Sequence, residues 1–345
     1  MNTLIISEDK LCIAADILKN GGLIASPTET VYGLCANGLN EEAVKNIYLA
    51  KGRPSDNPLI LHISNLDMLE PLVTDISPLA KTLIKNFWPG PMTLIFNASD
   101  IVPKRVTGGL DTVAIRFPSH PIMNKLIELS GLPLAAPSAN TSGKPSPTNY
   151  KRVYEDLNTK IDGIIAGGDC KYGLESTIID TTSEIATILR PGGITIEMLE
   201  DVLGKGNVML DPALGHSLKE GERPKAPGMK YTHYSPNAEV IIVKGEENAV
   251  IETINSEVVK RQAEGKKVGV LAVDENKNKF IADKILSAGT KTDLLTVSSS
   301  LFEMLRAFDD AGIDTVYSLA FEEKGIGKAI MNRLEKSAGY NIINV

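Results

Sequence analysis

Two polar segments near the start of the chain combine residue types that bind anionic ligands. Ser26–Leu34 joins hydroxyl groups and a carboxylate to a glycine, and Lys51–Pro58 places the cations Lys51 and Arg53 on either side of a glycine. Lysine binds phosphate as a point charge and arginine as a bidentate fork, so this pair could hold a polyphosphate. The alternative is that both cations are solvated at the end of a helix.

Two later segments offer contacts for a carboxylate and for phosphate or ribose oxygens. The polar segment Thr107–Thr112 is followed by the apolar run Val113–Ile115, and Arg116 comes directly after this run. If buried, this guanidinium needs an anionic partner, either a ligand carboxylate or a protein Asp or Glu. Pro137–Gly143 presents Ser138 and Asn140, whose hydroxyl and amide groups can bind phosphate or a ribose.

Several common site designs are missing from the sequence. It contains no Walker A motif, no Rossmann GxGxxG and no kinase signature, so a nucleotide site must have a less common design. No Ser-His-Asp or Cys-His arrangement suggests covalent catalysis. The three cysteines form no CxxC, and the four histidines lack metal-ligand spacing, so no metal site is expected.

Short strands alternating with helices must position these segments in the first two hundred residues. Capping and apolar spacing predict helices from Ser7 to Gly21, from Asn40 to Lys51, and at Pro78–Asn86, Pro121–Leu129 and Asn149–Leu157. Strands are predicted at Leu23–Ser26, Leu59–Ile63, Thr93–Phe96, Val113–Arg116, Leu134–Ala136, Gly163–Ala166, Thr177–Asp180 and Thr187–Leu189. This pattern indicates an α/β domain with a mixed sheet.

The composition of the sequence changes after residue 205. Prolines and glycines alternate over residues 206–236, which predicts a linker without elements of its own. Residues 237–345 then alternate strands with helices, as in a small parallel sheet covered on both faces. Strands are expected at Val240–Val243, Lys267–Val273, Leu294–Val297 and Thr315–Leu319, and helices at Asn248–Glu264, Lys279–Leu286, Leu301–Ala311 and Ala329–Ser337.

Composition bounds the class of protein. The chain has 345 residues, of which 43% are hydrophobic and 23% charged, as in an ordinary soluble protein of two domains. No apolar run approaches the ~20 residues of a membrane span, and the acidic N-terminus is not a signal peptide, so we expect a cytoplasmic protein without a membrane contact. The net charge of −7 argues against a wide nucleic-acid-binding face, although a weak local RNA contact stays possible.

Taken together, the segments resemble one family. PTETVYGL, KGRPSDNPLILHI, AIRFP, PSAN-SG and GLESTIID occur in the order and spacing of the YrdC-type threonylcarbamoyl-AMP synthases. HYSP and GIGKAIMNRLEKSA in the second half are similar to the long, two-domain form of that family. The resemblance implies a twisted YrdC-like α/β domain with a concave cavity at residues 1–205, a linker or lid at 206–236, and a smaller Rossmann-like α/β domain at 237–345.

The resemblance also implies a reaction. L-Threonine, bicarbonate and ATP give threonylcarbamoyl-AMP and pyrophosphate, and partner proteins then transfer the threonylcarbamoyl group to an adenosine of tRNA. Such chemistry depends on positioning and on neutralising charge, with Mg²⁺ carried on the phosphates of ATP and no dedicated metal ligands.

The site residues follow from the matched motifs. Threonine would be bound by Thr30, His62, Arg116, Ala136 and Ser176. ATP would be bound by Lys51, Arg53, Asn57, Thr112, Ser138, Asn140, Ser146, Arg190 and, from the linker, Tyr234. Lys51 and Arg53 are the expected catalytic residues, because they would neutralise charge on the phosphates.

Two alternatives stay open at this stage. One is the carbamoyl-adenylate chemistry of hydrogenase maturation proteins, whose chains carry zinc-finger and acylphosphatase-like regions that this sequence lacks. The other is a non-catalytic RNA-binding module, which the acidic net charge disfavours.

Overall fold

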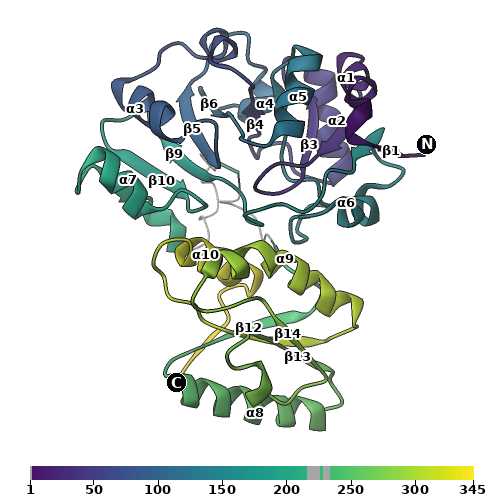
Figure 1. The fold of residues 1–345 in the computed structure, drawn as a ribbon, viewed down its shortest axis with the longest axis vertical. Coiled ribbons are helices and arrows are strands. Elements are labelled where there is room, and N and C mark those ends of the chain that lie inside the picture. Colours follow the sequence, from purple (N-terminus) through teal and green to yellow (C-terminus); the bar gives the residue numbers. More distant parts are fainter. Residues whose placement is uncertain (1, 216–225, 228–233) are drawn as a thin grey trace. The chain divides into compact units, whose positions relative to one another are not determined.

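The computed structural model describes residues 2–215, 226–227 and 234–345 (Figure 1). It divides the chain into two compact units. The first comprises residues 1–142 and 146–231, and the second comprises residues 143–145 and 232–345. None of the helices in the described ranges is long and apolar enough to cross a membrane.

The first unit is built on an eleven-stranded mixed sheet of order β1-β8-β2-β3-β7-β4-β6-β5-β9-β10-β11. Its strands are β1 (Leu4–Ile6), β2 (Ile24–Ser26), β3 (Gly33–Asn37), β4 (Ile60–His62), β5 (Met92–Asn97), β6 (Thr112–Arg116), β7 (Leu134–Ala135), β8 (Gly163–Ile165), β9 (Thr177–Asp180), β10 (Ala186–Arg190) and β11 (Val208–Leu210). Every strand predicted in this unit is confirmed to within two residues. β1, β3 and β11 were not predicted.

Helices cover both faces of this sheet. They are α1 (Leu11–Lys19), α2 (Glu41–Lys51), α3 (Pro78–Phe87), α4 (Lys104–Thr107), α5 (Pro121–Ser130), α6 (Tyr150–Leu157) and α7 (Ile196–Leu203). The main core joins α2, α3, α6 and α7 to one face, and a second core joins α1 and α5 to the other face near β2, β3 and β7. The expected α/β architecture is therefore confirmed.

One part of the second face has no helix over it in the described ranges. Along β4, β6, β5, β9 and β10 its apolar residues are few, and they form a small cluster of Ile60, Ile95, Ala114, Ile178, Leu189 and Ala226. Because strand side chains alternate between faces, the residues in phase with this cluster point away from the main core. We call this part of the sheet the uncovered face, because no helix of the described ranges packs on it; the apolar residues of its cluster, Ala226 among them, are buried.

Local signals explain where the binding segments begin. The Asn40 side chain accepts hydrogen bonds from the amides of Glu42 and Ala43 and so starts α2. Gly52 ends that helix in the left-handed conformation, with φ of 60°. Lys51 is therefore the last helical residue, and the chain turns directly after it.

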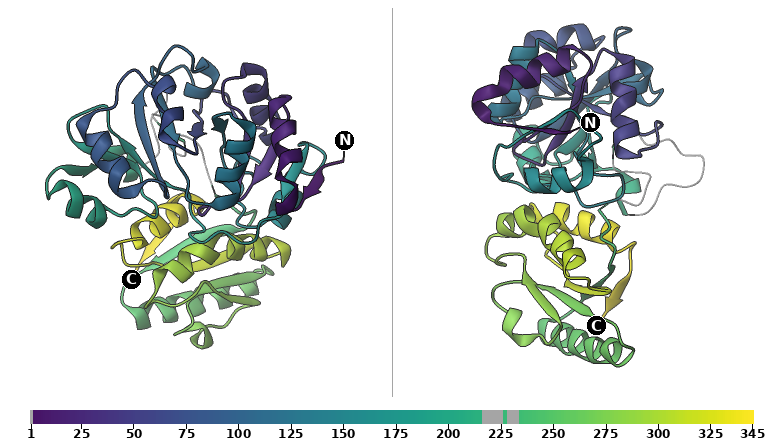
Figure 2. Two further views of the ribbon diagram at one scale, coloured as in Figure 1. Left: turned by 45° about the horizontal axis from the view of Figure 1, so that its top comes forward. Right: turned by 90° about the vertical axis from the view of Figure 1, so that its right-hand side faces the viewer.

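The second unit is a five-stranded parallel sheet of order β14-β13-β15-β12-β16. The strands are β12 (Glu239–Lys244), β13 (Val268–Ala272), β14 (Lys284–Ser287), β15 (Thr315–Leu319) and β16 (Ile342–Asn344). Helix α8 (Glu247–Ala263) lies on one face, and α9 (Leu294–Asp310) and α10 (Gly327–Ser337) lie on the other (Figure 2). The predicted parallel sheet with helices on both faces is confirmed.

Two predicted elements of this unit are wrong. Leu294–Val297 is the first turn of α9 and not a strand, because Asp293 caps the helix and Val297, Leu301 and Leu305 recur at helical spacing. Lys279–Leu286 is not a helix, because its second half forms the partly exposed edge strand β14, where packing imposes no clear alternation.

The expected linker is not free of structure at its start. β11 pairs with β10, and a short 3-10 helix follows at Pro212–Gly215. β11 was not predicted because its three residues are too few to show an apolar period and prolines and glycines surround them. Most of the remaining linker lies outside the described residues.

Candidate active site

The five residues expected to bind threonine include three on the uncovered sheet face. His62 ends β4 and is paired with Arg116 at the end of β6. Both are in phase with Ile60 and Ala114, so both side chains leave the sheet on the side away from the main core. Ala136 follows β7 on the same side, and its amide donates to the Ile60 carbonyl at 3.0 Å.

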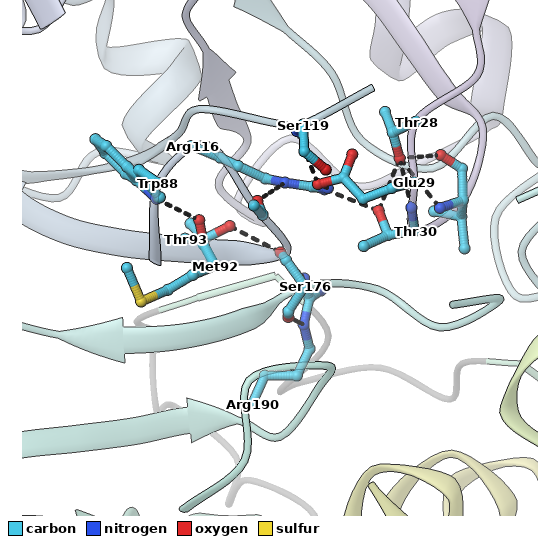
Figure 3. Close-up of polar contacts among 12 residues, drawn as sticks. Thr28, Glu29, Thr30, Trp88, Met92, Thr93, Arg116, Ser119, Ser176 and Arg190 are labelled. Atoms are coloured by element: carbon cyan, nitrogen blue, oxygen red, sulfur yellow. Dashed lines mark hydrogen bonds and ion pairs between the residues drawn. The ribbon is translucent and has the colours of Figure 1, made fainter. Parts of the chain in front are cut away.

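Arg116 is the centre of the cluster in Figure 3. It is only 3% exposed. Its Nη1 donates to Thr30 Oγ1 at 2.8 Å, and its Nε donates to the Gly90 carbonyl at 3.2 Å. Its Nη2 lies 2.7 Å from Glu29 Oε1. The protein carboxylate that the sequence left open as a partner for Arg116 is therefore present, and it is Glu29.

Glu29 is one of two residues of this cluster that the sequence motifs did not predict. Burial alone would raise the pKa of its carboxyl, but Arg116 and the Ser119 amide outweigh burial and hold the pKa below its usual value. Its Oε1 accepts from Ser119 N, whereas Oε2 is buried and has no hydrogen-bond partner in the described part of the chain. A buried carboxylate oxygen of this kind calls for a donor from water or a ligand.

Ser176 and Arg190 join this cluster from the strands on the far side of β5. Thr93, the residue paired with Arg116 across β5 and β6, lies 2.7 Å from Ser176 through their hydroxyl oxygens. Arg190 donates to the Ser176 carbonyl at 3.0 Å and to its hydroxyl at 3.2 Å. The five expected threonine residues are thus linked to one expected ATP residue, Arg190, through hydrogen bonds and strand pairing.

His62 is uncharged at neutral pH. Burial, with the neighbouring positive charge of Arg116 adding to it, lowers the pKa of His62 to about 3. Its Nδ1 donates to the Ile60 carbonyl at 3.3 Å. A neutral imidazole adds no second positive charge beside the guanidinium, so it can contact the apolar and hydroxyl parts of a small ligand.

This shifted pKa predicts a pH dependence of stability. Between pH 7 and pH 5 the His62 side chain binds a proton in the unfolded chain but not in the folded chain, so the free energy of unfolding falls as pH falls. The contribution is roughly 1.4 kcal/mol per pH unit below about 6.5. His120, whose pKa burial also lowers, adds to the same trend.

Urea unfolding of the wild type and of His62→Gln at pH 7 and pH 5 measures this contribution. Between the two pH values, the free energy of unfolding should fall less in the variant than in the wild type, because the unfolded variant no longer binds the extra proton at this position. An identical loss in both proteins would mean that His62 is charged in the fold.

The expected ATP residues Lys51, Ser138 and Asn140 are brought together. The Lys51 ammonium donates to the carbonyls of Ser138 at 2.5 Å and of Asn140 at 2.6 Å. Ser138 Oγ donates to the Asn140 side chain at 2.5 Å. Lys51 is 2% exposed, so the solvated helix end is the wrong interpretation for this lysine.

Arg53, Asn57 and Thr112 lie at the beginning of β4 and β6. Arg53 Nη2 donates to the carbonyls of Asn57 and Pro58, at 3.4 and 3.1 Å. The side-chain oxygen of Asn57 is buried and has no hydrogen-bond partner among the residues described. Thr112 begins β6, four residues before Arg116. Because Ala114 pairs with Ile60, Thr112 lies beside the residues that precede β4.

The last two expected ATP residues are less closely tied to these groups. Ser146 is buried, and its hydroxyl donates to Glu175. Tyr234 belongs to the second unit, where its ring stacks on Phe302 with centroids 5.2 Å apart and Arg333 lies 5.6 Å from the ring centre. Within the second unit, Tyr234 therefore lies in a packed aromatic contact.

Two linker residues lie against the uncovered face. Ala226 is fully buried in the cluster with Ile60 and Ala114, and the Pro227 carbonyl accepts from Arg190 Nη1 at 3.5 Å. The rest of the proline- and glycine-rich segment, from residue 216 to residue 233, lies outside the described residues.

Comparison with known proteins places this site in a family. Residues 16–192 match the family described as telomere recombination, and residues 194–339 match the threonylcarbamoyl-AMP synthase C-terminal domain. The threonylcarbamoyl-AMP synthase of Pyrococcus abyssi is 49% identical over 99% of this chain and 97% of its own length. The Bacillus subtilis enzyme is 46% identical over 98% and 95%.

The chain belongs to the threonylcarbamoyl-AMP synthase family. A crystal structure of P. abyssi Sua5 in complex with L-threonine covers 99% of this chain and all of its own, at 48% identity and a TM-score of 0.94. Family membership and the two-part fold inferred from the sequence motifs are both confirmed.

The two residues of the cluster that were not predicted, Glu29 and Thr93, both have a signal in the sequence. Glu29 stands in the PTETVYGL motif, in the loop after β2. Thr93 is polar and in phase with Ile95 at the start of a strand, so it points to the uncovered face.

Proposed function

We propose that this protein condenses L-threonine, bicarbonate and ATP into threonylcarbamoyl-AMP and pyrophosphate on the uncovered face of the first sheet. The observation that carries the proposal is the cluster of Thr30, His62 and Arg116 with Ser176, set beside a buried carboxylate oxygen of Glu29 that has no hydrogen-bond partner among the described residues. Such a cluster presents donors and one acceptor from the ends of several strands, as binding sites for small polar molecules do.

Threonine binding would use both signs of charge in this cluster. Arg116 would bind the threonine carboxylate, and Glu29 Oε2 would accept a hydrogen bond from the amino group, which gives that buried oxygen its missing donor. Neutral His62 and Ala136 would contact the side chain. The fixed distance between Arg116 and Glu29 would orient the amine for reaction.

The nucleotide would lie along Lys51, Arg53, Ser138 and Asn140, with Arg190 at the boundary between the two substrates. Asn57, Thr112, Ser146 and Tyr234 would contribute further polar contacts to the nucleotide. The Lys51 and Arg53 charges would neutralise negative charge on the phosphates as pyrophosphate leaves.

The reaction needs positioning more than covalent help from the protein. The threonine nitrogen forms a bond to the bicarbonate carbon, one carbon–oxygen bond breaks, and water leaves. A carbamate oxygen then forms a bond to the α-phosphorus as the bond to the β-phosphate bridge breaks. Holding the carbamate beside the α-phosphate supplies most of what such a step requires, because the carbamate would otherwise revert.

Mg²⁺ would enter with the phosphates of ATP. No three or more His, Cys, Asp or Glu side chains gather as a metal site in the described part of the chain. Magnesium commonly keeps several waters and binds through substrate phosphates, and it would neutralise phosphate charge together with Lys51 and Arg53. The product would then pass to threonylcarbamoyl-transfer proteins that act on tRNA, with at most a weak RNA contact to this chain.

Pyrophosphate release tests the proposed function. Release should require ATP, threonine and bicarbonate together. Serine should replace threonine with a rate lower by roughly 10–200-fold, because one methyl contact is worth only about 1–3 kcal/mol. Matched reactions that omit one substrate at a time are the controls. Equal pyrophosphate release without any amino acid would exclude the proposal.

A further inference from the structure

The second unit contains a cavity of about 270 Å³ that the function of the first unit does not use. Every residue that lines it lies between Val243 and Glu322, within the second unit. Small-molecule sites usually span roughly 300–1,000 Å³, so this cavity is at the small end of that range and has no room for a dinucleotide.

The cavity lies where the sheet changes its winding direction. β12 and β15 are parallel neighbours. After β12 the chain enters α8 on one face, and after β15 it enters α10 on the other face (Figure 1). Val243 and Leu319, near the carboxyl ends of these two strands, line the cavity together. In open α/β sheets this position is where ligands bind, because the diverging loops leave a crevice.

Residues after all four neighbouring parallel strands reach this cavity. Asn276 comes from the loop after β13 and Lys291 from the loop after β14, in addition to the residues from β12 and β15. Asn276 is 1% exposed; its side-chain oxygen accepts from Val273 N at 3.3 Å, and its side-chain nitrogen lies 3.5 Å from Glu247 Oε1. Asn276 thus helps to position Glu247, whose partly exposed carboxylate can accept hydrogen bonds from the hydroxyl groups of a ribose.

The lining is apolar on one side and charged at the rim. Val243, Leu319 and Phe321 form the apolar side, and Leu319 and Phe321, which are 6% and 8% exposed, keep surface that a flat base can contact. Lys244 and Lys291 stand at the rim and are about half exposed, with Lys291 paired to Glu247 at 2.8 Å. Their ammonium groups can turn to a single phosphate without leaving water.

The rim does not suit a polyphosphate. Two lysines of the lining are balanced by Glu247 and Glu322. The amides at the start of α8 are already capped, because the Glu246 carboxylate accepts from Asn248 and Ala249. A ligand with one phosphate matches this balance better than ATP or pyrophosphate does.

We propose that this cavity binds a nucleoside monophosphate, with the base against Leu319 and Phe321, the ribose at Glu247, and the phosphate at Lys244 and Lys291. AMP is the natural probe, because transfer of an acyl group from an acyl-adenylate releases AMP. The inference does not rest on catalysis by the first unit, since every contact lies in the second.

Methyl NMR of the full-length protein provides a local readout. Titration with AMP should shift the methyl signals of Val243 and Leu319 in a saturable way, whether or not the first unit also binds AMP. Lys291→Ala should weaken this binding roughly tenfold, the loss of one charge-assisted hydrogen bond. Lys260→Ala is the matched control, because this exposed lysine of α8 pairs with Glu257 and does not line the cavity.

The outcomes are distinct. Saturable shifts that weaken in Lys291→Ala but not in Lys260→Ala support the site. No shift of either methyl at millimolar AMP overturns it. Equal shifts with inorganic phosphate alone would exclude recognition of the nucleoside, and equal affinity for adenosine would exclude the role of the two lysines.

Discussion

Arg116→Ala is expected to abolish threonine binding and to lower the free energy of unfolding by about 3–5 kcal/mol. Both effects follow from one observation: the guanidinium is buried beside the Glu29 carboxylate, with Nη2 and Oε1 2.7 Å apart. Removing the cation leaves a buried carboxylate without compensation, and it removes the proposed clamp for the threonine carboxylate. Calorimetric titration and urea unfolding measure the two effects separately.

A double variant separates the structural role of Arg116 from its role in binding. Arg116→Met with Glu29→Gln removes both charges while keeping similar volume, so much of the lost stability should return. Threonine binding should not return, because neither charged contact is present. Restored threonine binding in the double variant, or equal losses of threonine and ATP binding in Arg116→Ala, would contradict the proposed carboxylate clamp.

Arg53→Ala should lower turnover by roughly 10²–10³-fold, the effect of removing one preorganised charge-stabilising group. The thermal stability of this variant should change little, because the Arg53 side chain is only partly buried and donates to two carbonyls of a loop, those of Asn57 and Pro58. Arg53→Lys is the matched control, since it keeps the charge and loses the fork. Full activity of Arg53→Ala would show that Arg53 is only a solvated cation after the end of α2.

Lys51→Ala should differ from Arg53→Ala in stability. From the sequence alone, both cations are expected to lie in a loop where substitution leaves the fold intact. The structure buries Lys51 and gives its ammonium two backbone carbonyls, from Ser138 and Asn140. Leaving these acceptors without a donor costs about 1–3 kcal/mol for each one that water cannot reach. The loss of turnover in Lys51→Ala therefore has to be corrected for a loss of folded protein.

The sequence predicts the elements of the first unit well, because their signals are local. Asn40 caps α2, Ser77 caps α3 with Pro78 in its first turn, and β-branched runs mark the strands. It fails where a signal is short or conflicting. β11 has three residues, and the Leu294–Val297 run has strand-forming side chains at the start of a helix that Asp293 caps.

The residues of the candidate site could be predicted from the sequence, but their contacts could not. Motifs in order identified Arg116, His62 and Ser176, but they could not show which side chains meet. That information lies in strand pairing over long sequence separations: Arg116 pairs with Thr93, and Thr93 reaches Ser176, 83 residues further along the chain. The partner of Arg116 could not be chosen from the sequence either, because Glu29 and a ligand carboxylate satisfy the same charge.

The uncovered sheet face is proposed to join bicarbonate to threonine and to adenylate the resulting carbamate. The mass of the product formed from ¹³C-bicarbonate, L-threonine and ATP tests this reaction. The product should be an adenylate that contains threonine and one ¹³C atom, formed together with pyrophosphate and undetectable with Arg116→Ala. Threonyl adenylate without the ¹³C atom, or the same labelled product from Arg116→Ala at the wild-type rate, would contradict this proposal.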